Sequence, residues 1–208
     1  ALALQKTQPG LKLGQVLVNH DNMAVLNLLQ TGIRSTRQLK RMVDSLLDIQ
    51  RLEEGRKMLD RSPVDLRELL GEAVQLVQPL AIDAGQRLTF DLDGVLPSVL
   101  LDRDMIVRVL TNLIENAIKY TPEGGTIVVR AQNRGDHARV SVVDDGPGIP
   151  HDQQGLIFDK FNRVKYQDAP KGVGLGLAFC RLAVRAHEGD IWVESDTGRG
   201  SEFVFTLP

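Results

Sequence analysis

Apolar residues recur at three- and four-residue intervals over residues 39–52, with arginine and aspartate between them. This is the period of an amphipathic helix, and it puts one apolar stripe along a long helix. A lone helix cannot bury such a stripe, so a partner helix is expected, either from residues 11–29 or from a second chain. Thr31-Gly32 supplies a break between the two helices, and Ser35 a candidate N-cap. The pattern predicts a helical hairpin that pairs with its own copy into a four-helix bundle.

Beyond Pro63 the pattern changes to helices that alternate with strands. Amphipathic helices are expected over residues 66–82, 104–120 and 174–186. Strand-like runs are expected over residues 87–92, 126–131, 139–143, 190–194 and 202–206. Most of these strands form consecutive hairpins, so the sheet should be mixed, mostly antiparallel and covered by helices on one face. The predicted fold class is α+β, with a helical hairpin in domain 1–58 and an α/β sandwich in domain 62–208.

Composition and charge exclude several partners. The net charge is -2, and no block of Lys or Arg offers a surface that could follow a phosphate backbone, so nucleic acid is not expected. The single cysteine, Cys180, excludes an internal disulfide, fits a reducing compartment and lies in an apolar helical run typical of a core thiol. The chain has neither a long apolar stretch nor a signal peptide, so it should be a cytoplasmic fragment without membrane contact. Its start at Ala1 is what we expect of a piece of a longer protein, which could be membrane-anchored.

Four side chains share one face of the helix expected over residues 104–120, namely Asn112, Asn116, Lys119 and Tyr120. This spacing lets them converge on one ligand. An Asn carboxamide oxygen is a neutral, hard donor that suits magnesium already carrying phosphate charge. Lys119 can neutralise phosphate charge and Tyr120 can pack against a nucleotide. For this helix alone a solvated polar face is the favoured interpretation, so the segments that follow must decide between the two.

The strand expected over residues 139–143 runs into Asp144-Asp-Gly-Pro-Gly148. A carboxylate at a strand end can accept a hydrogen bond from the exocyclic amine of adenine. Gly146 and Gly148 let the backbone approach the base closely. For this segment alone, an ordinary turn is the default interpretation.

A second glycine-rich segment precedes the last expected helix. Gly172, Gly174 and Gly176 expose backbone N–H groups and the positive helix end to phosphates. The Rossmann fingerprint does not fit, because its third glycine position holds Leu177 in one register and Phe179 in the other. A Walker A loop is absent from the sequence. The polar stretch between Phe161 and the first of these glycines, residues 162–171, has the composition of a mobile lid.

Four segments follow one another in order along the chain: residues 112–116, 144–148, 158–161 and 172–177. They resemble the N, G1, F and G2 boxes of sensor histidine kinases, whose ATP-binding domain belongs to the GHKL family shared with gyrase, Hsp90 and MutL. The resemblance covers roughly residue 62 to the end, and residues 39–55 resemble the second dimerisation helix of these kinases. Gly200-Ser201 resembles the last box of the family.

The resemblance implies ATP and Mg2+ as cofactors, with Asn116 as the metal ligand and Asp144 as the adenine anchor. The ATP contacts that it implies are Asn112, Asn116, Lys119, Tyr120, Asp144, Gly146, Gly148, Lys171, Gly172, Gly174, Gly176, Leu177 and Ser201. Asn112 stands where the hydrolysing relatives hold the Glu that activates water, which favours phosphoryl transfer over hydrolysis.

The function implied is that of a homodimeric ATP:protein-histidine phosphotransferase that passes phosphate to an aspartate of a response regulator. The acceptor motif departs from the family, because only His20-Asp21 match it and the stretch from His20 to Gly55 is shorter than the usual hairpin. Either the hairpin is degenerate or the sequence lacks residues of the protein. We expect His20 to be the acceptor and Asp21 to orient it, with a structural histidine against Leu13 and Leu17 as the alternative. A degenerate kinase, acting as a nucleotide-binding interaction module, is the alternative function.

Overall fold

The structure is a computed structural model that describes residues 9–56, 58–162 and 173–208 of the chain. The chain divides into two compact units, Ala1–Asp44 and Ser45–Pro208. The last turns of the first helix, α1 (Pro9–Glu53), therefore belong to the second unit. The sequence instead places the domain division between residues 58 and 62.

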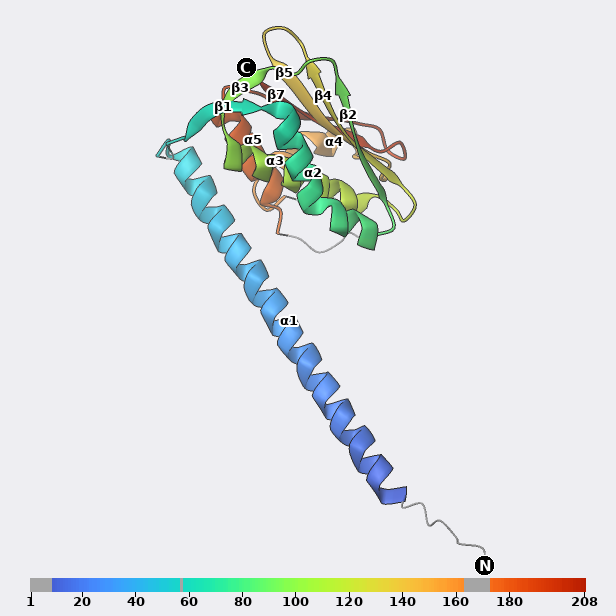
Figure 1. Cartoon of the computed structure of the whole chain (residues 1–208). Helices are drawn as coiled ribbons and strands as arrows, with labels where there is room; N and C mark the ends of the chain where they lie inside the picture. Colours follow the sequence, from blue (N-terminus) through green and yellow to red (C-terminus); the bar gives the residue numbers. More distant parts are fainter. Residues whose placement is uncertain (1–8, 57, 163–172) are drawn as a thin grey trace, which may run out of the picture. The chain divides into compact units, whose positions relative to one another are not determined.

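Helix α1 is continuous over 45 residues (Figure 1). The break predicted at Thr31-Gly32 is wrong, and Ser35 lies inside the helix instead of capping a new one. Glycine in a helix interior costs only about 1 kcal/mol relative to alanine, which a long helix can absorb. Gly32 lies inside α1, and its carbonyl accepts a hydrogen bond from the Thr36 hydroxyl at 2.9 Å. The helix ends at Glu53, and Gly55 in the turn that follows has a φ of 63°, which lets the Arg56 N–H reach the Arg51 carbonyl at 2.9 Å.

Large apolar side chains of α1 within the first unit are more than half exposed. They are Val25, Leu26, Leu28, Leu29, Ile33, Leu39 and Val43. Among the described residues, no helix has the length and hydropathy that crossing a membrane would require.

The second unit has the predicted α+β fold. Its main sheet has the order β2-β4-β5-β7-β6, in which β2 pairs with β4 in parallel and the other neighbours are antiparallel. The strands are β2 (Arg87–Asp93), β4 (Thr126–Asn133), β5 (Ala138–Asp144), β6 (Ile191–Ser195) and β7 (Ser201–Leu207). Helices α2 (Leu66–Asp83), α3 (Arg103–Tyr120) and α5 (Gly176–Ala186) cover one face (Figure 1). The short elements are β1 (Arg61–Asp65) and β3 (Ser98–Asp102), which form a small antiparallel sheet, α4 (His151–Gln154) and the 3-10 turn Leu156–Phe158.

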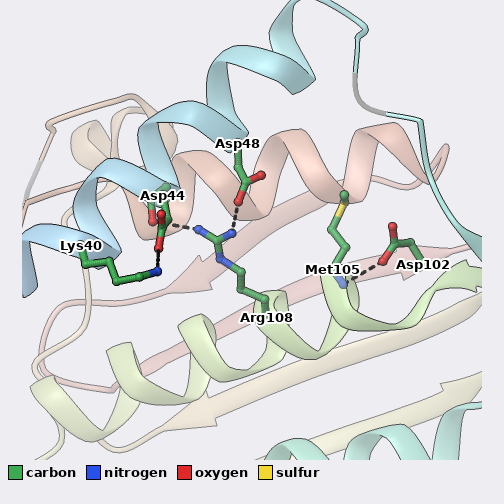
Figure 2. A network of polar contacts seen from close by, with 7 residues as sticks. Lys40, Asp44, Asp48, Asp102, Met105 and Arg108 are labelled. Carbon is green, nitrogen blue, oxygen red and sulfur yellow. Dashed lines mark hydrogen bonds and ion pairs between the residues drawn. The ribbon is translucent and has the colours of Figure 1, made fainter. Parts of the chain in front are cut away.

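The core lies between α3 and the strands β4 and β5. Asp102 caps α3 by accepting a hydrogen bond from the Met105 N–H at 3.1 Å (Figure 2). The apolar residues of α3 repeat with the helical period and are buried, whereas every second residue of β4 points to the same core. Burying one large aliphatic side chain contributes roughly 1.5–3 kcal/mol, so this packing holds α3 firmly. The polar face of α3 is thereby presented in one orientation.

Cys180 lies on the inner side of α5 and is fully buried, as the sequence predicted. Its Sγ lies 3.7 Å from the Val109 carbonyl oxygen on α3. Burial raises the pKa of the Cys180 thiol to about 12, only partly offset by its contact with Asn112. This thiol is therefore a packing element between α3 and α5.

His187 joins the end of α5 to the start of α3. The residue is 3% exposed, and the ring Nε2 accepts a hydrogen bond from the Asp102 N–H at 2.9 Å. Its Nδ1 lies 2.8 Å from the Ala183 carbonyl, so the neutral ring donates there. Burial lowers the pKa of His187, because a charged ring would lose water and could no longer accept from the Asp102 N–H.

The free energy of unfolding should therefore fall as the pH drops below the ordinary histidine pKa of 6.5. The unfolded chain takes up the proton first, so the contribution of His187 is complete above 6.5 and is lost as the pH falls through its lower folded-state pKa. Urea unfolding of wild type and His187→Gln, at pH values about one unit above and below 6.5, checks this. The stability of the variant should depend less on pH. Equal pH dependence of the two proteins would show that His187 does not carry the effect.

Candidate functional site

Helix α3 and the start of α5 face each other at the predicted site. A Cβ added to Gly176 would lie 3.6 Å from Asn112 Oδ1, so this carboxamide lies against the first residue of α5. Both residues are half-buried. Asn116 is one turn further along the same face of α3 and is also half-buried. The structure therefore brings together two segments that are about sixty residues apart in the sequence.

The last turn of α3 carries Lys119 and Tyr120. Lys119 Nζ lies 4.8 Å from the Tyr120 ring centroid and donates a hydrogen bond to its hydroxyl at 3.3 Å. A Cβ added to Gly146 would lie 3.3 Å from the Tyr120 carbonyl oxygen. The end of α3 therefore meets the glycine turn that follows β5.

Asp144 is a buried carboxylate at the end of β5, with 5% of the residue exposed. Its Oδ1 accepts a hydrogen bond from the Gly146 N–H at 2.8 Å, and the Ser201 N–H also stabilises it. Burial nevertheless raises the pKa of Asp144 to about 6, and the neighbouring Asp145 adds to the rise. Burial disfavours the charged form of this carboxylate. A ligand that donates a further hydrogen bond to Asp144 would stabilise the charged form.

Two glycines near Asp144 lie so close to neighbouring backbone that a side chain would not fit at either position. Gly200 has φ 83°, and a Cβ added there would lie 1.9 Å from the Asp144 carbonyl oxygen. A Cβ added to Gly148 would lie 2.0 Å from the Asp196 carbonyl oxygen. Ser201, the predicted contact in the last segment, is buried and follows this contact directly. The turn that follows β5 and the turn that precedes β7 thus pack closely against each other beside the Asp144 carboxylate.

Gly200→Ala should lower the free energy of unfolding by roughly 3–4 kcal/mol, because the added methyl group is strained in φ and collides with the Asp144 carbonyl. The matched control is Gly198→Ala, which has φ 82° but nothing within 4 Å of the added Cβ. The control should cost only about 1 kcal/mol, the price of the left-handed conformation. Urea unfolding of both variants checks the difference. Similar losses in the two would show that the close approach at Gly200 is relieved by backbone movement.

The F and G2 segments meet through their backbones. The Phe161 N–H donates to the Gly174 carbonyl at 2.9 Å, and a Cβ added to Gly174 would lie 2.8 Å from the Asn162 carbonyl oxygen. The first turn of α5 follows, where Leu177 is half-buried and no side chain caps the helix. Uncapped N–H groups at a helix start are suited to anions.

Some predicted residues lie outside the described part. Lys171, Gly172 and the expected lid, apart from Asn162, fall in residues 163–172, which are not described. His20 and Asp21 lie on α1 within the first compact unit, and their side chains are not described either. The roles of these residues remain predictions.

Ser195 is a site residue that sequence reasoning missed. Its hydroxyl accepts from the Ile149 N–H at 2.8 Å and donates to the Gly200 carbonyl at 2.7 Å, so it ties the two glycine turns together. It lies two residues after buried Val193 on β6. The period of two that defines the strand could have placed this serine on the inner face.

The donor set fits a nucleotide with phosphates. Asp144 offers a buried acceptor for an amine, and the start of α5 and Lys119 offer N–H groups and positive charge for phosphates. Among the described residues, no group of three or more His, Cys, Asp or Glu could hold a metal ion by itself. A magnesium ion at Asn116 would therefore take most of its ligands from phosphate and water, which is how this ion is often bound.

Comparisons with known proteins agree with this geometry. The family model described as "Histidine kinase-, DNA gyrase B-, and HSP90-like ATPase" matches residues 101–208. The adaptive-response sensory kinase SasA of Synechocystis sp. is 35% identical over 182 residues, which cover 87% of this chain and 48% of that protein. The chain thus spans about half the length of the curated relatives it matches.

Solved structures of histidine kinases are also similar. The catalytic domain of ThkA has a TM-score of 0.65 and 34% identity, over 72% of this chain and 96% of that one. The structure of ThkA in complex with the response regulator protein TrrA has a TM-score of 0.65 and 30% identity, over 83% of this chain and 48% of that one. Full-length ShkA in complex with AMPPNP has a TM-score of 0.73 and 32% identity, over 82% of this chain and 35% of that one. The chain belongs to the family of histidine kinase-, DNA gyrase B- and HSP90-like ATPases, and its second unit has the fold of a histidine kinase catalytic domain.

Proposed function

We propose that this chain is part of an ATP-dependent protein-histidine kinase, which passes the phosphoryl group on to an aspartate of a response regulator. The observation that carries the proposal is the convergence of Asn112 with the uncapped start of α5 at Gly176. The names of the similar proteins support it, because ShkA was solved with an ATP analogue and ThkA with a response regulator.

Each part of the site has a separate role in this proposal. Asp144 accepts a hydrogen bond from the adenine amine and so selects the base. The first turn of α5 and Lys119 orient the phosphates, and Asn116 holds magnesium. When bound, ATP with magnesium supplies the activated phosphoryl group. Asn112 cannot take a proton from water as a carboxylate would, so the site favours transfer to a protein acceptor over hydrolysis.

We infer that His20 receives the phosphoryl group and that Asp21 orients its ring, as carboxylates commonly do for imidazoles. A hydrogen bond from one ring nitrogen to Asp21 would leave the lone pair of the other nitrogen available for attack.

We also infer a homodimer formed through α1. The apolar side chains exposed on α1, from Val25 to Val43, need a covering surface, and a second copy of the same helix supplies one.

Incubation with γ-labelled ATP and magnesium tests the function directly. A protein label that is lost in acid and stable in base is expected, since this is the behaviour of phosphohistidine. An acid-stable label would indicate another acceptor and contradict the proposal. Nucleotide binding without any label would favour the alternative, a degenerate kinase that acts as a nucleotide-binding interaction module.

Asp144→Asn should weaken nucleotide binding on the order of 1–3 kcal/mol, because an acceptor that faces the adenine amine is partly replaced by a donor. The stability of the free protein should not fall, since burial opposes the charge that the substitution removes. In the wild type, affinity should drop as the pH falls below about 6, where Asp144 becomes protonated. Calorimetric titrations of both proteins across this pH range check the two statements on affinity, and urea unfolding checks the one on stability. Unchanged affinity in Asp144→Asn would exclude Asp144 as the adenine anchor.

A further inference from the structure

The last turns of α1, residues 45–53, are docked within the second compact unit. Ile49 is 1% exposed there. Directly before it in the sequence, Asp48 forms an ion pair with Arg108 of α3 (Figure 2). Arg108 also donates a hydrogen bond to the Ser45 hydroxyl at 2.8 Å. The side chains of Arg108 and Asp48 are 32% and 18% exposed, so this contact is shielded from solvent more than a surface salt bridge. Replacing Asp48 by a neutral residue would take this ion pair away from a half-buried guanidinium.

The same guanidinium reaches the helices that frame the nucleotide site. Its carbon lies 4.0 Å from the centroid of the Phe179 ring, a cation–π contact. Phe179 is buried on α5, three residues after Gly176, and Arg108 is one turn before Asn112 on α3. One side chain therefore connects the end of α1 with both helices of the site.

A second contact links α1 to the segment over residues 158–161. Lys160 Nζ lies 2.7 Å from the Glu53 carboxylate. Lys160 directly precedes Phe161, whose N–H is bonded to Gly174. The docked end of α1 thus touches the site at two separate points.

We propose that Arg108 is a positioning residue that couples the docked end of α1 to nucleotide affinity. The inference rests on the proposed function, because it requires a nucleotide between α3 and α5. Docking of residues 45–53 holds α3 and α5 in the arrangement that the ligand needs. The entropy lost in ordering these helices on binding is therefore smaller, and the affinity is higher. The coupling is reciprocal, and bound nucleotide therefore strengthens the contact of Arg108 with Asp48.

The contact has room to open and close. A groove of about 390 Å³ lies beside Arg108, and Asp104 and Phe179 are among the residues that line it. Asp104 is one turn before Arg108 on α3, the spacing at which an acid and a base pair on a helix. An Arg108 released by Asp48 thus has a second carboxylate within its range. A pairing with Asp104 in place of Asp48 would be the second arrangement that coupling between sites requires.

The test compares two aspartates that are one turn apart on α1. Asp48→Asn removes the ion pair with Arg108, whereas the control Asp44→Asn removes a pair within the helix, to Lys40 at 2.7 Å, and no described contact of Asp44 with α3 (Figure 2). The affinity for AMPPNP with magnesium, measured by calorimetry, should be about 5-fold weaker in Asp48→Asn and unchanged in Asp44→Asn. Asp48→Glu, which keeps the charge, should recover most of the affinity. Ser45→Ala, which removes one hydrogen bond and no charge, should weaken binding in the same direction by less.

Hydrogen exchange separates coupling from a purely structural role. AMPPNP should slow the exchange of residues 45–53 in the wild type and have little effect there in Asp48→Asn at saturating analogue. Equal affinities in wild type, Asp48→Asn and Ser45→Ala, together with equal protection of these residues, would overturn the coupling and leave the proposed function standing. A wild-type protein that binds no AMPPNP would overturn both.

Discussion

Asn116→Ala should remove magnesium-dependent nucleotide binding and phosphoryl transfer while the fold stays intact. Asn116 lies on the half-buried polar face of α3, whereas the neighbouring Ala117 and Leu113 carry the packing. Alanine is the better helix former, so the substitution should not weaken α3. The metal loses a protein ligand, and a loss on the order of 100-fold or more in magnesium-dependent affinity is expected.

Calorimetry with AMPPNP, with and without magnesium, measures this effect, and circular dichroism shows that the variant is folded. The matched control is Glu115→Ala, one position earlier on the exposed side of α3, which should bind as the wild type does. If Asn116→Ala binds and transfers normally, Asn116 is a solvated polar residue and the metal is held elsewhere.

His20→Gln should abolish protein labelling by γ-labelled ATP and leave AMPPNP affinity unchanged. Glutamine is similar in size and polarity but cannot act as the nucleophile, so the substitution separates the chemistry from binding. The loss should be complete within detection, because no second group shares the role in this proposal.

His137→Gln is the matched control, since His137 lies in the turn between β4 and β5 and contacts Asp136 at 2.6 Å. Its labelling should equal that of the wild type. Retention of an acid-labile label in His20→Gln would show that another histidine accepts the phosphoryl group. Absence of label from both wild type and His20→Gln would support the degenerate-kinase interpretation.

The strands of the main sheet and the three helices that cover it could be predicted closely, because each has at least five residues and its apolar residues follow the period of a strand or a helix. Helix α3, expected over residues 104–120, is Arg103–Tyr120, and the strand expected over residues 139–143 is Ala138–Asp144. Strand β1 was missed because Pro63 lies inside it, and proline normally argues against a strand. Strand β3 was missed because Leu100 puts an apolar side chain on its exposed face.

The parts of the candidate site that could be predicted are those whose residues are close together in the sequence. Asp144 with Gly146, and Asn112 with Asn116, are groups within single turns, and the structure brings these segments together. The contacts of Arg108 with Asp48 and of Ser195 with Ile149 join residues that are 60 and 46 positions apart, so the period of a single element does not reveal these contacts. The continuous α1 was misread for a different reason, since glycine lowers helix stability without forbidding the helix.

The packing of Cys180 between α3 and α5 gives the protein an internal reporter. Alkylating reagents need a thiolate and an open approach, and the folded chain offers neither at neutral pH. Iodoacetamide therefore reacts only when α5 separates from α3, and the rate of modification counts those openings. Because Cys180 contacts Asn112, the helices that must part to expose the sulfur are the same two that frame the nucleotide site. A nucleotide that binds only the closed arrangement would lengthen the lifetime of the unmodified thiol by the factor 1 + [L]/Kd, where [L] is the free nucleotide concentration.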